Sequence, residues 1–282
     1  MENIQERAMS YLLVSDDNYF PGLVAQINSI LKHSPESKIY LVHDLSKENF
    51  SLIKDYIYKS EIFDETPWAH LPERSRHITK ISLGRFQVDF IEEDYFFYMD
   101  TDIIQQKDFK LEKPKNIAIE IKIQPINPSI HHLDRFQLMR DFIFNNGGET
   151  EKEGDFTLYA DATFYANKKW MINVLRPKMI EVSKKYTEQN ILQRWFDMQY
   201  FHTAICILGK DLVEELSIKN AWMGLPFIKE EYPNFFKYNN IDNCELLHYC
   251  GPGKPWTKDV VMNEKTKEIW FRYYLDGPIK HN

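Results

Sequence analysis

Two aspartates, Asp100 and Asp102, stand where the apolar run Tyr95–Met99 ends. In an extended backbone, side chains at positions i and i+2 point the same way, so the two carboxylates are expected to face one side. Carboxylate oxygens suit Mg²⁺ or Mn²⁺, and ligands collect at the carboxyl ends of strands in α/β sheets. The pattern is compatible with a divalent cation that carries a diphosphate, although Asp-x-Asp alone is more often a solvated turn.

A second segment that could carry chemistry runs from residue 248 to residue 256. It reads His248-Tyr249-Cys250-Gly251-Pro252-Gly253-Lys254-Pro255-Trp256. A neutral imidazole at His248 would complete a carboxylate metal site. Gly251 and Gly253 would let backbone N–H groups approach a phosphate, and Lys254 would add a positive charge. The structural alternative is a loop with a surface lysine.

The elements that must position these residues alternate along the chain. Strand-like runs cover residues 10–15, 38–43, 95–104, 116–123, 156–165 and 245–249, and helical patterns follow Pro21 and cover residues 47–60, 78–91, 130–144, 170–185 and 191–208. Residues 149–155 form a charged loop after two glycines. This alternation predicts an α/β fold with a mainly parallel central sheet flanked by helices on both faces.

Composition restricts the function classes. The chain has 282 residues, 43% hydrophobic and 15% aromatic, which is enough for a large core. Lysine and arginine total 35 against 42 aspartates and glutamates, giving a net charge of -7. Because this sign is wrong for gripping a phosphate backbone over a broad surface, we expect no nucleic-acid partner.

Cellular location is predicted from the apolar runs and the cysteines. The apolar runs are only a few residues long, and the first residues are charged rather than basic and then apolar, so no transmembrane segment or secretion signal is expected. Cys206, Cys244 and Cys250 are too few and too unevenly spaced for a disulfide framework. We therefore expect a cytoplasmic protein, for which peripheral membrane contact stays open.

The second segment carries a resemblance to a known family. Its pattern His-x-x-Gly-x-x-Lys-Pro-Trp resembles the C-terminal signature of the family 8 retaining glycosyltransferases, the glycogenin and lipopolysaccharide galactosyltransferase group, at all five fixed positions. Such a match arises by chance about once in ten thousand sequences. The aromatic run before Asp100 and Asp102 also resembles that family's Asp-x-Asp segment.

This resemblance implies a fold and an activity. The fold would be a GT-A-type, Rossmann-like nucleotide-diphospho-sugar transferase fold in one domain, residues 1–282. A nucleotide-binding half would cover about residues 9–125, an acceptor half with the closing metal and phosphate loop about 126–260, and a C-terminal helix 261–282. The activity would be metal-dependent, retaining transfer of a hexose from a UDP-sugar donor to a saccharide or glycoconjugate acceptor.

The resemblance also implies roles for individual residues. Mn²⁺ (or Mg²⁺) would bind Asp100, Asp102 and His248, with Lys254 on the diphosphate of the UDP-sugar. The remaining donor-binding candidates are Asp16, Asn18, Tyr19, Lys80, Arg85, Thr101, Gly251 and Gly253. Asp16 and Asn18 would hydrogen-bond base or ribose and Tyr19 would stack on uracil, whereas the alternative for this loop is helix N-capping by Asp17 or Asn18. Arg85 would lie near the donor, with Lys80 in reserve, and the alternative for both is a solvated helix charge.

The chain departs from the family on the reacting side. Asp161 stands where relatives usually have an asparagine, before Lys168-Lys169-Trp170. The family's Asp-Gln-Asp, which faces the anomeric carbon, aligns with either Asp197 or Gln199 but not with both. We therefore expect Asp161, Asp197 and Gln199 to be the catalytic candidates.

Two other function classes stay open. One is a sugar-nucleotide nucleotidyltransferase, which normally has a glycine-rich, basic first loop, whereas residues 15–19 are acidic. The other is a catalytically inactive nucleotide-sugar-binding module, which the altered residues near Asp161 and Asp197 keep open. Donor hydrolysis in the presence of Mn²⁺ distinguishes these classes from a transferase.

Overall fold

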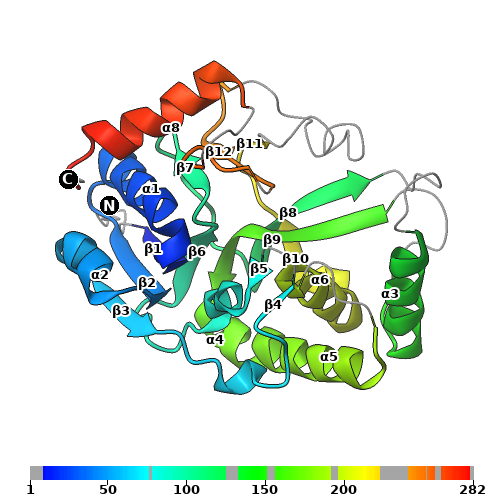
Figure 1. Ribbon diagram of the computed structural model, residues 1–282. Coiled ribbons are helices and arrows are strands. Elements are labelled where there is room, and N and C mark those ends of the chain that lie inside the picture. The colour runs from blue at the N-terminus through cyan, green and yellow to red at the C-terminus, as the bar shows by residue number, and fades with distance from the viewer. Residues whose placement is uncertain are drawn as a thin grey trace, which may run out of the picture.

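A seven-stranded sheet with the order β10-β8-β9-β6-β1-β2-β3 forms the centre of the computed structural model (Figure 1). The structure describes residues 9–75, 78–124, 133–150, 156–191, 196–222, 241–251, 253–257 and 262–279. The strands are β1 Ser10–Asp16, β2 Lys38–Asp44, β3 Lys59–Ile62, β6 Tyr95–Met99, β8 Ile117–Gln124, β9 Phe156–Asn167 and β10 Val213–Glu215. Only β9 is antiparallel to its neighbours, β6 and β8, so the predicted mainly parallel sheet is confirmed.

Helices cover both faces of this sheet (Figure 1). They are α1 Phe20–His33, α2 Lys47–Ile53, α3 Leu133–Asn145, α4 Lys168–Trp170, α5 Arg176–Glu188, α6 Phe196–Leu208 and α8 Glu264–Asp276, with a π-helical turn, Met171–Leu175, between α4 and α5. Leu12 packs on the face with α5 and α6, whereas Leu13 packs on the face with α1. Because both faces are covered, β1 is apolar without interruption from Tyr11 to Val14, as in buried parallel strands. No helix in the described part of the chain is both long enough and apolar enough to cross a bilayer.

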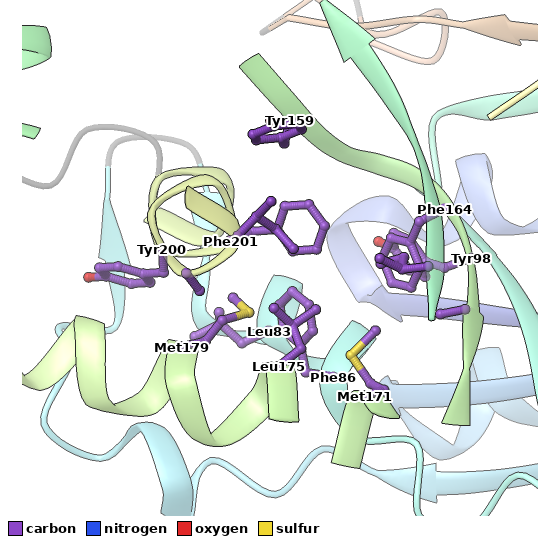
Figure 2. Packing of buried hydrophobic residues seen from close by; sticks show 14 of the residues in the cluster. Leu83, Phe86, Tyr98, Tyr159, Phe164, Met171, Leu175, Met179, Tyr200 and Phe201 are labelled. Atoms are coloured by element: carbon purple, nitrogen blue, oxygen red, sulfur yellow. The ribbon is translucent and has the colours of Figure 1, made fainter. Parts of the chain in front are cut away.

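An aromatic cluster joins three elements beneath the end of β6. Figure 2 shows Phe86, Phe164 and Phe201 close together, with ring centroids 6.4 Å apart for Phe86 and Phe164 and 6.0 Å apart for Phe164 and Phe201. Phe86 ends the 3-10 helix Lys80–Phe86, while Phe164 lies on β9 and Phe201 on α6. All three side chains are fully buried, so this packing fixes the positions of the three elements relative to one another.

Three expected elements differ from the observed ones. The helix expected at 47–60 ends at Ile53, and after a 3-10 turn, Lys54–Tyr56, the chain enters β3, which pairs with β2. The helix expected at 78–91 is instead the short strand β5 Ile78–Thr79, paired with β4 Arg74–Ser75, and the 3-10 helix Lys80–Phe86. The strand expected at 95–104 breaks after Met99, and β7 Ile103–Gln105 joins a second sheet of order β11-β12-β7, with β11 Asn220–Trp222 and β12 Leu246–His248. In the first and third cases pairing with a strand outside the segment overrides the local periodicity, whereas in the second a local hairpin and a 3-10 helix replace the α-helix.

Other expected elements are confirmed with shifted ends. The helix expected at 170–185 is observed as α4, the π-helical turn and α5 together. The helices expected at 130–144 and 191–208 appear as α3 and α6, with residues 130–132 and 192–195 outside the described residues. Most of the charged loop expected at 149–155 also lies outside them.

One glycine is required where the first helix meets the end of the sheet. A Cβ on Gly22 would lie 2.7 Å from the Trp256 ring and 2.8 Å from the carbonyl oxygen of Thr101. Contacts this short are not tolerated between carbon and backbone oxygen. Gly22 therefore lets α1, the turn after β6 and the loop with Trp256 approach one another closely.

Candidate functional site

The two aspartates and the histidine meet where β6 ends. Asp100 and Asp102 lie in a turn closed by a hydrogen bond from Ile103 N to Asp100 O, 3.0 Å long. The antiparallel register of β12 with β7 places His248 opposite Ile103, and its Nε2 lies 3.2 Å from Asp102 Oδ1. One ligand atom from each of Asp100, Asp102 and His248 lies within 4.8 Å of the others. The three do converge, but through a turn and not through the extended backbone that the sequence suggested.

These three residues fit a divalent cation. Asp102 Oδ1 is buried, and although His248 Nε2 lies 3.2 Å away, no described residue donates a hydrogen bond of good geometry to it. A buried carboxylate oxygen without a hydrogen bond is costly unless a positive charge lies beside it. Two carboxylates and an imidazole are oxygen and nitrogen ligands that Mn²⁺ and Mg²⁺ accept.

Lys254 lies at the edge of this group. Its Nζ contacts Asp102 Oδ2, donates to Tyr249 O at 3.0 Å and lies 5.8 Å from the Tyr19 ring centroid. Burial lowers the pKa of the Lys254 ammonium, but the attraction of Asp102 outweighs it and raises this pKa. Burial likewise opposes ionisation of Asp102, but Lys254 and His248 hold the pKa of this carboxyl below its usual range.

Arg85 pairs with three carboxyl groups, one of which is that of Asp100. One guanidinium nitrogen lies 3.0 Å from Asp100 Oδ1 and 2.7 Å from Asp197 Oδ2, and another lies 3.0 Å from Asp161 Oδ2. Arg85 Nε also donates to Ser82 O at 2.8 Å, which holds the side chain against its own 3-10 helix. The structure thus brings together two catalytic candidates, Asp161 and Asp197, with the arginine expected near the donor.

The three carboxyl groups of this cluster share one guanidinium, so ionisation of all three is unfavourable. Burial raises the pKa of Asp161 well above its ordinary value, and repulsion from Asp197 and Asp100 adds to the rise while Arg85 opposes it. Burial and repulsion from Asp102 also raise the pKa of Asp100, again against Arg85. One guanidinium facing three carboxyl groups, of which Asp161 and Asp100 have raised pKa values, leaves a cluster that favours a proton or a further positive charge.

A bulge in β9 places Asp161. The pairing of β8 with β9 jumps from Ile119 opposite Phe164 to Glu120 opposite Ala160. Asp161 and the two residues after it therefore lack partners on β8, and Ala162 O accepts a hydrogen bond from Asp100 N at 2.8 Å. A bulge of this kind redirects a side chain and is common beside functional sites.

Gln199 and Lys80 have partners outside the carboxylate cluster. Gln199 hydrogen-bonds the Tyr186 hydroxyl of α5. Lys80 makes ion pairs with Glu65 and Glu73, at 3.0 and 3.1 Å. The Arg85 group therefore includes Asp197, while these two candidates make other contacts.

The first loop caps its own turn. Asp16 Oδ1 accepts hydrogen bonds from the backbone N–H groups of Asn18 and Tyr19, at 3.0 and 3.1 Å, so Asp16 and not Asp17 or Asn18 is the cap. The Tyr19 ring lies edge-on to Trp256, with centroids 5.9 Å apart, and Asn18 is exposed. Thr101 also stabilises the backbone here, because its hydroxyl donates a hydrogen bond to the carbonyl oxygen of Val14.

Two glycines beside Lys254 and one further residue, Tyr98, complete the site. Gly251 has φ of +93°, which glycine adopts without strain, and Gly253 is partly buried just before Lys254. Tyr98 was not among the sequence candidates, yet its hydroxyl donates to Asp100 Oδ1 and its ring lies 4.8 Å from the Arg85 guanidinium. The signal for it was its position two residues before Asp100, on the same side of an extended strand.

Similar proteins are glycosyltransferases. No protein-family model matches the chain. Glycosyltransferases GlyD and GlyE of Streptococcus pneumoniae serotype 4 (strain TIGR4) are 24% and 22% identical over 93% and 94% of this chain. The chain spans only 30% and 60% of the lengths of these two relatives.

Solved structures show the same fold. The galactosyltransferase LgtC, in complex with donor and acceptor sugar analogues, matches with a TM-score of 0.66 and 18% identity over 96% of both chains. The crystal structure of GlyE matches with a TM-score of 0.60 and 22% identity, over 95% of this chain and 61% of GlyE. The predicted fold and the predicted resemblance are therefore both confirmed: the chain has the GT-A glycosyltransferase fold and is similar to the family 8 glycosyltransferases.

Proposed function

We propose that this protein is a metal-dependent, retaining glycosyltransferase that moves a hexose from a UDP-sugar to a saccharide or glycoconjugate acceptor. One observation carries the proposal. Asp100 belongs at once to the metal-ligand group with Asp102 and His248 and to the Arg85 cluster with Asp197, so a diphosphate site and a sugar site would share one carboxylate. In this proposal the chain is one domain, with the nucleotide-binding half at about 9–125 and the acceptor half at about 126–260.

The phosphate side of the site would bind and stabilise the leaving group. Asp100, Asp102 and His248 would hold Mn²⁺ or Mg²⁺, which when bound would neutralise the diphosphate and favour departure of UDP. Lys254 would donate to a phosphate oxygen, and Gly251 and Gly253 would expose backbone N–H groups to it. The residues left for the nucleoside are Asp16, Asn18, Tyr19 and Thr101, at the carboxyl ends of β1 and β6.

The sugar side would orient the hexose and stabilise its charge. Two Arg85 nitrogens pair with the carboxylates of Asp161 and Asp197. These carboxylates could also accept hydrogen bonds from sugar hydroxyls. Retention without a separately placed nucleophile implies an oxocarbenium-like step in which the acceptor attacks on the face that UDP leaves. The negative charge around Arg85 would stabilise the positive charge that builds on the anomeric carbon.

The test is release of UDP from a panel of UDP-hexoses, with Mn²⁺ and with EDTA. Slow, Mn²⁺-dependent release without acceptor, accelerated by a saccharide acceptor, supports the proposal. Release of pyrophosphate from UTP and a sugar phosphate would instead identify a nucleotidyltransferase. Tight UDP binding with no release from any UDP-sugar would identify an inactive binding module.

A further inference from the structure

The Lys254 ammonium is bound to a carboxylate that the candidate metal site also uses. Nζ contacts Asp102 Oδ2, and the side chains of Lys254 and Asp102 are only 7% and 9% exposed. Asp102 presents its other oxygen to His248 Nε2, at 3.2 Å. The contact is therefore made away from bulk water, where opposite charges attract more strongly than at the surface.

The backbone of Lys254 is fixed while its side chain is long. Lys254 N donates to Thr257 Oγ1 at 3.2 Å, and the N–H and hydroxyl of Thr257 donate back to Lys254 O at 3.0 and 2.7 Å. A lysine stem has four rotatable bonds. The ammonium can consequently change its partner by side-chain rotation, without movement of the loop.

The Lys254 ammonium and a divalent cation cannot both bind the Asp102 carboxylate at full strength. A dication held by Asp100, Asp102 and His248 would lie beside an ammonium on the same Asp102 group, and like charges so close repel. We propose that in the nucleotide-free protein Lys254 competes with the divalent cation for Asp102, and that a nucleoside diphosphate relieves this competition by offering the ammonium a phosphate oxygen. The inference rests on the metal site of the proposed function.

The consequence is an order of binding. The cation binds weakly to the free protein and tightly once a diphosphate is present, and by linkage the cation strengthens diphosphate binding by the same factor. Direct contact between phosphate and cation also produces such coupling. Only removal of the ammonium separates the two causes, because direct contact does not change the affinity of the nucleotide-free protein for the cation.

The test is calorimetric titration of MnCl₂ into nucleotide-free wild type and into Lys254→Met. We expect the variant to bind Mn²⁺ about tenfold more tightly than wild type, within the range typical of coupling between sites. Lys254→Arg keeps the charge and is expected to bind Mn²⁺ as wild type does. Lys168→Met is the matched control, because it removes one lysine charge beyond Asn167, which pairs with the first residue of β6 at the opposite end from Asp100.

Outcomes separate this inference from the proposed function. Mn²⁺ affinity that is unchanged or weaker in a folded Lys254→Met variant overturns the competition while leaving the metal site intact. Absence of Mn²⁺ binding in wild type and variant, with and without UDP, overturns the metal site and the inference together. If Lys254→Met fails to give a native circular dichroism spectrum, Lys254→Gln carries the same comparison, since it removes the charge and keeps a hydrogen-bond donor at the end of the side chain.

Discussion

The Arg85 guanidinium lies 3.0 Å from Asp100 Oδ1, whereas the Lys254 ammonium contacts the other aspartate, Asp102. The two aspartates of the Asp-x-Asp segment thus have different positive partners, Arg85 for the first and Lys254 for the second. In the proposed function this division assigns Asp102 mainly to the diphosphate and lets Asp100 connect the diphosphate with the sugar.

Binding of UDP is expected to need a divalent cation. Removal of the cation with EDTA should weaken UDP binding at least about tenfold, because the phosphates would then meet Asp100 and Asp102 without a neutralising charge. Asp102→Asn should abolish this cation dependence and should cost more activity than Asp100→Asn, because Asp102 lies directly against His248. Calorimetry of UDP with Mn²⁺ and with EDTA measures the effect, and Asp55→Asn, on an exposed turn, is the control. Equal UDP affinity in both conditions contradicts the metal role.

Lys254→Ala is expected to lower kcat with only a modest change in the KM for the donor. The reason is that an ammonium on the diphosphate favours departing UDP more than bound donor. A charge-assisted contact contributes about 1.5 to 3 kcal/mol, which corresponds to a roughly ten- to hundredfold lower rate. Steady-state kinetics of UDP release checks this, with Lys168→Ala as the control. A loss confined to KM would assign Lys254 to ground-state binding alone.

Asp197 and Gln199 are expected to differ. Asp197→Asn should depress donor hydrolysis and transfer together, about ten- to a thousandfold, because Asp197 lies in the Arg85 cluster where charge on the sugar would be stabilised. Gln199→Ala should have the smaller effect, because Gln199 hydrogen-bonds Tyr186. Released UDP and glycosylated product are measured in the same reaction. A larger joint loss in Gln199→Ala would assign the position facing the anomeric carbon to Gln199.

Asp161→Asn is expected to stabilise the protein, and more so as the pH rises. The folded state raises the pKa of Asp161, so folded protein binds this proton over a pH range in which unfolded protein has released it. Stability that depends on the proton is present below the unfolded pKa of about 4 and is lost as the pH rises through the folded pKa. Asparagine removes this loss, so we expect a melting temperature higher by about 2 °C or more at pH 8 and a smaller gain at pH 5.

Thermal unfolding of both proteins across that pH range measures the difference. Asp211→Asn, on an exposed position, is the matched control and should shift the curve little. If the gain in melting temperature shrinks as the pH rises, Asp161 is ionised in the folded protein. The attraction of Arg85, and not burial, would then dominate the pKa of Asp161.

The sequence determined the kind of fold and most of the residues on the proposed phosphate side. Alternating strand-like and helical runs predicted the mainly parallel sheet because covered strands must be apolar on both faces. The pattern from His248 to Trp256 indicated that His248 and Lys254 lie together with Asp100 and Asp102, as the structure shows. This was possible because the spacing of the pattern lies within one short segment of the chain.

The tertiary structure decided how the proposed sugar side is built. Arg85, Asp161 and Asp197 are 76 and 36 residues apart in the chain, and they meet because a 3-10 helix, a bulge in β9 and the start of α6 pack on one aromatic cluster. Local periodicity predicted an α-helix around Arg85 and could not indicate the bulge, because a bulge depends on the register between β8 and β9. The sequence could not indicate the ion-pair partners of these three residues either. These buried ion pairs join groups that are far apart in the chain and that only tertiary packing removes from water together.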